Sequence, residues 1–154
     1  AMYFPPATGG EFLISDSAIG FDGTSPAYGV PTGEQVSADA ALVTALVEAS
    51  SAAGETSHRG LYATYDTFYR DMFGIDAKGS SRADAMRKDM NARGVMALDM
   101  ETSALLAAGQ DLGLAVATMC YGTVDALSQE KLGAEALDSG ENQLFRIALD
   151  AITG

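Results

Sequence analysis

The strongest constraint on the fold lies between residues 94 and 121, where two apolar runs enclose one helix-forming segment. The first run is GVMAL at 94–98 and the second is LAVATMCY at 114–121, and neither carries a charge. Short apolar runs of this kind are typical of strands that are buried on both faces. Residues 99–112 between them are rich in alanine and leucine and stop at Gly113, which predicts a helix. A helix held between two buried strands indicates the α/β class.

The same alternation extends over the whole chain. Strands are expected at 12–18, 58–64, 94–98 and 114–121, and helices at 37–54, 81–94, 99–112 and 136–152. Ser37 and Ser81 are the expected N-caps of their helices. Residues 20–36, rich in glycine and proline, and the polar residues 122–134 are expected to be loops. We therefore predict a single domain, residues 1–154, folded as a three-layer α/β/α sandwich with a mixed central sheet.

The acidic composition argues against several classes of partner. The chain has 21 Asp and Glu residues against nine Lys and Arg, for a net charge of −12. Phosphate backbones and anionic lipids are bound by concentrated basic faces, so neither nucleic acid nor a membrane surface is an expected partner. No apolar stretch reaches the roughly 18 residues of a membrane span, and no signal peptide opens the sequence. We expect a soluble protein inside the cell, in the cytoplasm or in an organelle matrix.

The single cysteine and the single histidine restrict the possible chemistry. Cys120 lies inside an apolar run and is interpreted as a small buried hydrophobic residue. His58 precedes a strand and is interpreted as structural or exposed. One cysteine forms no intramolecular disulfide, the metal-ligand spacings are absent, and one histidine without a nucleophile partner builds no catalytic triad. No metal site is therefore expected, and no organic cofactor is implied by the sequence.

Two carboxylates at the junction of strand and helix are the first candidates for a site. Asp99 and Glu101 flank Met100 directly after the apolar run, so one of the two acids is expected to point inward. In open α/β sheets, ligands bind at the carboxyl ends of the strands. Polar and aromatic residues follow two other expected strands as well, at 65–73 and at 122–125. The sequence therefore predicts a ligand site at this edge of the sheet.

Several segments resemble the nucleoside phosphorylase family. GVMALDMETSALLAAGQDLGL is similar to the family's stretch in which an acid-Met-Glu motif opens a helix, and YATYDTFY is similar to its Asp-Thr-Phe-Tyr segment. DGTS at 22–25 and TALVEASSAAG at 44–54 resemble the uridine phosphorylase branch most. The resemblance covers essentially all 154 residues in the family's order and implies the C-terminal part of its fold. It also implies reversible phosphorolysis of a nucleoside to free base and pentose 1-phosphate, with phosphate as co-substrate.

The resemblance assigns roles to individual residues. Glu101 stands at the family's glutamate position and is expected to bind the 2′- and 3′-hydroxyls of the ribose, since a carboxylate accepts both protons of a diol. Met100 is expected along the apolar face of the sugar, and Phe68 is expected to stack on the base or close its pocket. Leu98 takes the place where the family often has tyrosine. The alternatives are plain core packing for Met100 and Phe68 and an ordinary first-turn acid for Glu101.

A fifth site residue follows the last expected strand. In purine-cleaving relatives an aspartate protonates the leaving base near this place, which makes Asp125 a candidate general acid. A loop or capping acid is the alternative for Asp125. For Asp99 we expect a solvated or capping acid.

The chain also departs from the family pattern. In uridine phosphorylases a glutamine and an arginine, two residues apart, read the edge of the pyrimidine, and here Met72 and Gly74 stand at those places. Arg70 can replace them only with a rearranged loop. The family's phosphate site uses a glycine-rich loop and arginines upstream of the matching part, so no phosphate-binding residue is expected in this chain. The uncovered sheet edge predicts association with a complementary or homologous chain.

Three functions are compatible with these observations. The chain can be the C-terminal part of an active nucleoside phosphorylase, supplying the ribose and base contacts. It can be a catalytically inactive, phosphorylase-like structural subunit of a larger assembly. It can also be a small-molecule binding module that keeps a nucleoside or nucleobase pocket without chemistry.

Overall fold

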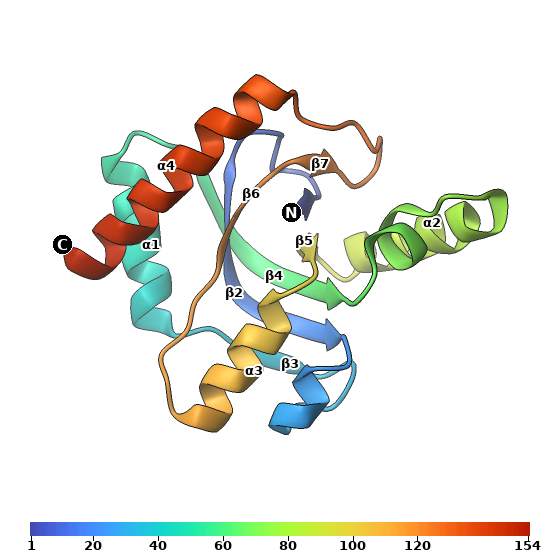
Figure 1. Ribbon diagram of the computed structural model, residues 1–154, viewed down its shortest axis with the longest axis horizontal. Helices are drawn as coiled ribbons and strands as arrows, with labels where there is room; N and C mark the ends of the chain where they lie inside the picture. The colour runs from blue at the N-terminus through green and yellow to red at the C-terminus, as the bar shows by residue number, and fades with distance from the viewer.

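A central mixed sheet organises the computed structural model, which describes all 154 residues. Its strands are β1 (Met2–Tyr3), β2 (Phe12–Phe21), β3 (Gln35–Ser37), β4 (Ser57–Tyr65), β5 (Val95–Asp99), β6 (Met119–Tyr121) and β7 (Val124–Asp125). They follow the order β3-β2-β4-β5-β1-β7, and β6 pairs with β2 beside β3. β2, β4 and β5 are parallel, as Figure 1 shows for the two central strands, whereas β3 and β6 run antiparallel to β2 and β1 runs antiparallel to β5.

Helices cover both faces of the sheet, which confirms the α/β sandwich. On one face Leu106 of α3 (Thr102–Leu112) joins Tyr62 of β4 in the largest core cluster. On the other face Val43 of α1 (Ala40–Ala52) packs with Ile14 of β2. Neighbouring residues of a strand point to opposite faces, so successive residues of β2 pack against the helices on the two faces of the sheet.

The remaining helices lie at the periphery. They are η1 (Ser25–Tyr28), η2 (Phe68–Phe73), α2 (Ala77–Ala92) and α4 (Ala134–Thr153). α4 packs against α1 and β6. α2 packs against η2 and β5, and in Figure 1 it extends away from the sheet. No helix is both long and apolar enough to cross a bilayer.

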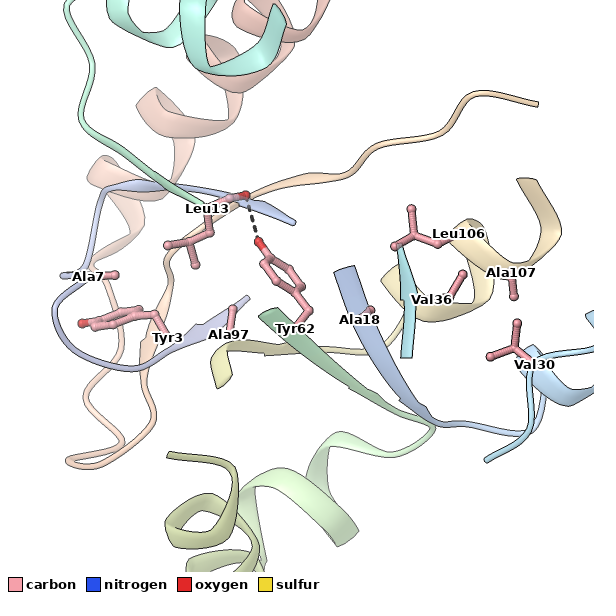
Figure 2. Packing of buried hydrophobic residues seen from close by; sticks show 10 residues of the cluster. All are labelled: Tyr3, Ala7, Leu13, Ala18, Val30, Val36, Tyr62, Ala97, Leu106 and Ala107. Atoms are coloured by element: carbon pink, nitrogen blue, oxygen red, sulfur yellow. Dashed lines mark hydrogen bonds between the residues drawn. The ribbon is translucent and has the colours of Figure 1, made fainter. Parts of the chain in front are cut away.

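The core is anchored by one buried tyrosine. Tyr62 is fully buried, and its hydroxyl donates a hydrogen bond of 2.8 Å to the carbonyl of Leu13 (Figure 2). Burial raises the pKa of Tyr62 well above its ordinary value, so the hydroxyl stays protonated and remains a donor. Because the polar end of the ring is satisfied, the residue fills the core without the cost of an unpaired hydroxyl.

Three of the four expected strands are confirmed, and the fourth needs correction. The expected strands at 12–18, 58–64 and 94–98 correspond to β2, β4 and β5. Of residues 114–121 only the last three form a strand, β6. The strand is short because β3 and β6 share one edge of β2. β3 pairs with residues 17–19 of β2, and β6 pairs with residues 12–14. Residues 114–118 instead run beside the sheet, where the Val116 carbonyl accepts the amide of Asp39.

Helix positions agree with expectation, but two N-caps do not. Ser37 is the last residue of β3, and α1 is capped by Asp39, whose carboxylate accepts the amides of residues 41 and 42. α2 begins before Ser81, at Ala77, with Asp76 as its cap. Ser37 cannot cap α1 because it is still paired in β3, and Ser81 cannot cap α2 because it lies inside that helix; in each case an aspartate stands directly before the first helical residue. The segments expected to be loops also contain η1 and the short strands β3 and β7.

Candidate functional site

A cavity of about 210 Å³ opens at the carboxyl edge of the sheet. Its walls come from the chain after β4, the end of β5, the segment around β6 and β7, and the N-terminal residues. The lining residues are Ala1, Met2, Phe68, Met72, Leu98, Asp99, Met100, Glu101, Cys120, Thr123 and Val124. This is the edge at which parallel strands present ligand sites.

Four of the five expected site residues line this one cavity. Phe68 comes from η2, where its ring stacks on Phe73 with the centroids 5.4 Å apart and the planes inclined by 20°. Leu98 is fully buried near the end of β5, whereas Met100 is 39% exposed. Glu101 completes the group at the start of α3. Residues that are 33 positions apart in the sequence are thus brought to a single opening, because β4 and β5 are parallel neighbours.

The two carboxylates at the β5–α3 junction have opposite surroundings. Asp99 is only 7% exposed; its Oδ1 accepts a hydrogen bond of 2.7 Å from the hydroxyl of Thr64, and its Oδ2 accepts one of 3.0 Å from the amide of Thr102. Glu101 is exposed, and its Oε2 accepts only a long bond of 3.3 Å from the amide of Met100. The inward acid is therefore Asp99, which caps the helix. Glu101 keeps most of its acceptor capacity free for a ligand at the cavity.

A second buried carboxylate, Asp22, lies at the first turn of α3, and the sequence alone did not single it out. Asp22 is 4% exposed and accepts hydrogen bonds from the hydroxyls of Ser25 and Ser103, at 2.8 and 2.6 Å, and from the amides of Thr24 and Ser25. Burial alone raises the pKa of a carboxyl, but the bonds from Ser103, Ser25 and Thr24 outweigh it and lower the pKa of Asp22. The segment DGTS, an aspartate followed three residues later by a serine, was the available sign of this turn.

Hydrogen bonds continue from this carboxylate to the start of α3. The amide of Ser103 donates to the hydroxyl of Thr64, which in turn donates to Asp99. On the other side the hydroxyls of Thr102 and Thr118 lie 2.8 Å apart, and Thr118 meets Ser15 of β2 at the same distance. No buried side-chain polar atom lacks a partner. This network fixes the N-terminal turn of α3, and with it the backbone that carries Glu101.

Cys120 is one of the residues that line the cavity. Burial raises the pKa of this thiol, so the reactive thiolate is disfavoured at neutral pH. The residue therefore acts as the small hydrophobic group that its apolar neighbours indicate. His58, the single histidine, lies elsewhere and pairs with Glu11 at 2.8 Å. The chain has no group of three or more histidine, cysteine or carboxylate side chains placed to share a metal ion.

Asp125 is the expected site residue that does not line the cavity. Its Oδ1 accepts the amides of Leu127 and Ser128, at 2.7 and 2.8 Å, and so holds the turn after β7. This is the geometry of a loop-stabilising aspartate. A general-acid role for Asp125 stays a prediction, and the arrangement of the cavity adds no support to it.

The two residues at the positions where uridine phosphorylases bind the pyrimidine edge have no polar side chain. Met72 lines the cavity and is 2% exposed, packed in the core cluster beneath β5. Gly74 has φ +69° and lies against the backbone of α2. Arg70 points to a different cavity, which it lines together with residues of α2. The cavity therefore offers a base mainly apolar surface and the hydroxyl of Thr123, which already donates to the Ala1 carbonyl at 3.2 Å.

The chain is similar to known proteins over most of its length. The chain is 31% identical to the uridine phosphorylase of Klebsiella aerogenes over 145 residues, which cover 92% of this chain and 57% of that protein. The uridine phosphorylase of Escherichia coli K12 is 30% identical with the same coverage, and that of Thermococcus kodakarensis is 26% identical over 93% of this chain and 50% of its own length. The chain thus spans little more than half the length of these relatives. Residues 7–152 match the sequence model of the Phosphorylase superfamily, and the chain therefore belongs to that superfamily.

Proposed function

We propose that this chain supplies the ribose and base contacts of a nucleoside phosphorylase, with the phosphate held by residues outside these 154. The single observation that carries the proposal is the convergence of Phe68, Leu98, Met100 and Glu101 on one cavity at the carboxyl edge of the sheet. Membership of the Phosphorylase superfamily and similarity to uridine phosphorylases support the reaction class.

In this proposal Glu101 accepts hydrogen bonds from the 2′- and 3′-hydroxyls of the ribose. An oxygen of phosphate attacks C1′, the bond from C1′ to the base nitrogen breaks, and the electron pair of that bond leaves with the base. The sugar passes through an oxocarbenium-like transition state, as in glycoside hydrolysis. A carboxylate close to the sugar stabilises this positive charge, and fixed backbone at the start of α3 holds the carboxylate in place before the reaction.

In this proposal the other contacts to the nucleoside come from apolar side chains. Met100 lies along the sugar, while Phe68 and Leu98 bound the space for the base. The ring of Phe68 is held by its stack on Phe73, so little side-chain entropy is lost when a base packs on it. The volume of 210 Å³ is below the roughly 300–1,000 Å³ of complete small-molecule pockets, which fits a half-site that residues outside this chain complete.

Glu101→Gln tests the proposal directly. Glutamine keeps the shape but accepts hydrogen bonds through one oxygen only, so we expect a loss of about 3–6 kcal/mol of transition-state stabilisation, a factor of roughly 10² to 10⁴ in kcat/KM. The assay contains phosphate and the polypeptide that carries the phosphate-binding residues. Release of free base from uridine, thymidine, inosine and adenosine is measured. The matched control is Glu135→Gln on the exposed first turn of α4.

The alternative is a catalytically inactive, phosphorylase-like structural subunit. The observation that favours it is the apolar character of Met72 and Gly74, which leaves no side chain to read the edge of a base. Under this alternative the wild type releases none of the four bases in the complete assembly. Activity in the wild type that survives unchanged in Glu101→Gln contradicts the assignment of Glu101 and leaves the superfamily in place.

A partner chain is part of both functions. Exposed apolar side chains gather on two helical surfaces, at Leu105, Leu112 and Leu114 around α3 and at Phe145, Leu149 and Ile152 along α4. Apolar surfaces of this kind are usually covered in an assembly. We expect the chain to sediment as an oligomer or complex at micromolar concentration, and a well-behaved monomer contradicts this expectation.

A further inference from the structure

Basic residues are concentrated in one segment of this acidic chain. Residues 70–93 hold six of the nine Lys and Arg and four of the 21 Asp and Glu, whereas the remainder holds three basic residues against seventeen acidic ones. The segment is thus net positive on a molecule of net charge −12. It covers most of η2 and all of α2, which extends away from the sheet in Figure 1. An anion that approaches the protein is attracted to this region and repelled by the remainder.

The largest cavity of the molecule lies in this basic region. It has a volume of about 430 Å³, sits between η2 and the first turns of α2, and shares no lining residue with the cavity at Glu101. Its walls are Tyr69, Arg70, Ile75, Asp76, Lys78, Gly79 and Arg82. The volume falls within the range of pockets for small organic ligands.

The charges around this cavity are only partly compensated. Arg82 pairs with Asp71, which lies outside the cavity wall. Neither Arg70 nor Lys78 forms a salt bridge in the structure. The carboxylate of Asp76 is occupied by the amide of Gly79 as the cap of α2. Two cations at the cavity, Arg70 and Lys78, therefore lack an ion-pair partner, and a bound anion supplies one.

The same cavity exposes apolar surface. The ring of Tyr69 is 58% exposed and the side chain of Ile75 is 79% exposed. Phe68 and Phe73 meet the Tyr69 ring edge to face, with centroids 5.1 and 6.5 Å away, so its orientation is fixed by packing. A flat ring that stacks on Tyr69 and contacts Ile75 buries this surface. The ligand that fits is therefore both anionic and planar.

A close backbone contact at Gly74 joins the two elements that form the cavity. Gly74 has φ +69°, and a Cβ atom there would lie 2.6 Å from the backbone of Gly79 and Ser80. η2 and α2 are thus in direct backbone contact, which only glycine permits at this position. This contact fixes the first turn of α2 relative to η2, and so fixes the backbone positions from which Arg70 and Lys78 reach the cavity.

We propose that this cavity binds a phosphomonoester of a planar ring, with the phosphate between Arg70 and Lys78 and the ring on Tyr69 and Ile75. A phosphomonoester carries a charge of roughly −1.5 to −2 at neutral pH, which matches two unpaired cations. Arginine binds phosphate oxygens bidentately, and lysine binds them as a point charge. The site is distinct from the nucleoside cavity and does not require phosphorolysis.

Phenyl phosphate is the probe, because it has no ribose and makes no use of Glu101. Its dissociation constant is measured by calorimetry on the full chain in its native assembly. Arg70→Ala and Lys78→Glu are each expected to weaken binding about tenfold or more, since each removes a charge-assisted hydrogen bond. Tyr69→Ala is expected to weaken phenyl phosphate more than inorganic phosphate. Arg146→Ala, an exposed arginine on α4 without a salt bridge, is the matched control and should change binding by less than about twofold.

Two results overturn the proposal. One is the absence of phenyl phosphate binding at millimolar concentration in the wild type, and the other is equal binding in the wild type and in Lys78→Glu. Arg70 and Lys78 are exposed, so both variants are expected to fold, and circular dichroism verifies this. Failure here leaves the function proposed for Glu101 untouched, because Glu101→Gln is expected to bind phenyl phosphate as the wild type does.

Discussion

The carboxylates around the N-terminus of α3 differ in burial and in hydrogen bonding. Asp22 and Asp99 are buried, at 4% and 7% exposed, and their hydrogen-bond donors are hydroxyls and backbone amides of the protein. Glu101, two residues after Asp99, faces the cavity and accepts one long bond. Buried carboxylates whose oxygens accept hydrogen bonds from the protein contribute to stability and have less capacity left for a ligand. An exposed one at a cavity retains that capacity.

This difference separates stability from function at neighbouring positions. The buried acids hold the first turn of α3 against β2 and β4, and they do so through Thr64 and Ser103. Glu101 is placed by that turn without being part of the hydrogen-bond network. Substitutions of the buried acids and of Glu101 should therefore affect different measurements, the free energy of unfolding in the first case and turnover in the second.

Asp22→Asn is expected to have the largest effect on stability. The amide group loses the charge and one acceptor oxygen, so the hydroxyls of Ser25 and Ser103 and the two backbone amides compete for the oxygen that remains. We expect a loss of about 3 kcal/mol in the free energy of unfolding, measured by denaturant titration of the native assembly. Glu34→Gln, at an exposed position, is the control. A loss below about 0.5 kcal/mol shows that the network is not a stabilising element.

Much of the fold could be predicted from the sequence, because its signals are local. β5 begins with four apolar residues, and β2 and β4 each contain short apolar or aromatic stretches; Gly113 ends α3 in the left-handed conformation that glycine favours. β1 and β7 are strands of two residues each and have no periodicity to detect. Their pairing depends on the position of β5, which is a tertiary contact.

The site was predictable in its location and less so in its details. Phe68 and Glu101 were expected at one edge because strands that are parallel neighbours end together. The sequence does not distinguish which of Asp99 and Glu101 points inward, since that depends on the backbone turn between β5 and α3. The partnership of Asp22 with Ser103 joins positions 81 residues apart and has no local pattern. The cavity beside α2 depends on the backbone contact of Gly74 with Gly79, which is equally non-local.

The contribution of Asp22 to stability should also depend on pH, with a smaller effect than the substitution itself. The pKa of Asp22 in the folded chain is lowered from its ordinary 3.8, so the unfolded state takes up this proton more readily than the folded state. The stability from Asp22 is thus complete above pH 3.8 and is lost as the pH falls through the lower, folded-state pKa. The difference in unfolding free energy between wild type and Asp22→Asn should therefore shrink below pH 3.8. A difference that is constant from pH 6 to acid unfolding contradicts the assignment.

The smallest expected effect is that of Glu101→Gln on stability. Glu101 is exposed, and its one contact is a bond of 3.3 Å from the amide of the preceding residue, which the glutamine oxygen also accepts. A first-turn acid gains a little from the helix dipole, so the loss should stay within about 0.5 kcal/mol. Unfolding of Glu101→Gln is measured beside wild type and Asp22→Asn under identical conditions. A loss as large as that of Asp22→Asn places Glu101 in the stabilising network, and any fall in turnover then reflects a damaged fold. An unchanged unfolding curve combined with lost turnover assigns Glu101 to substrate, because only a group that is free in the resting protein can be removed at so little cost to the fold.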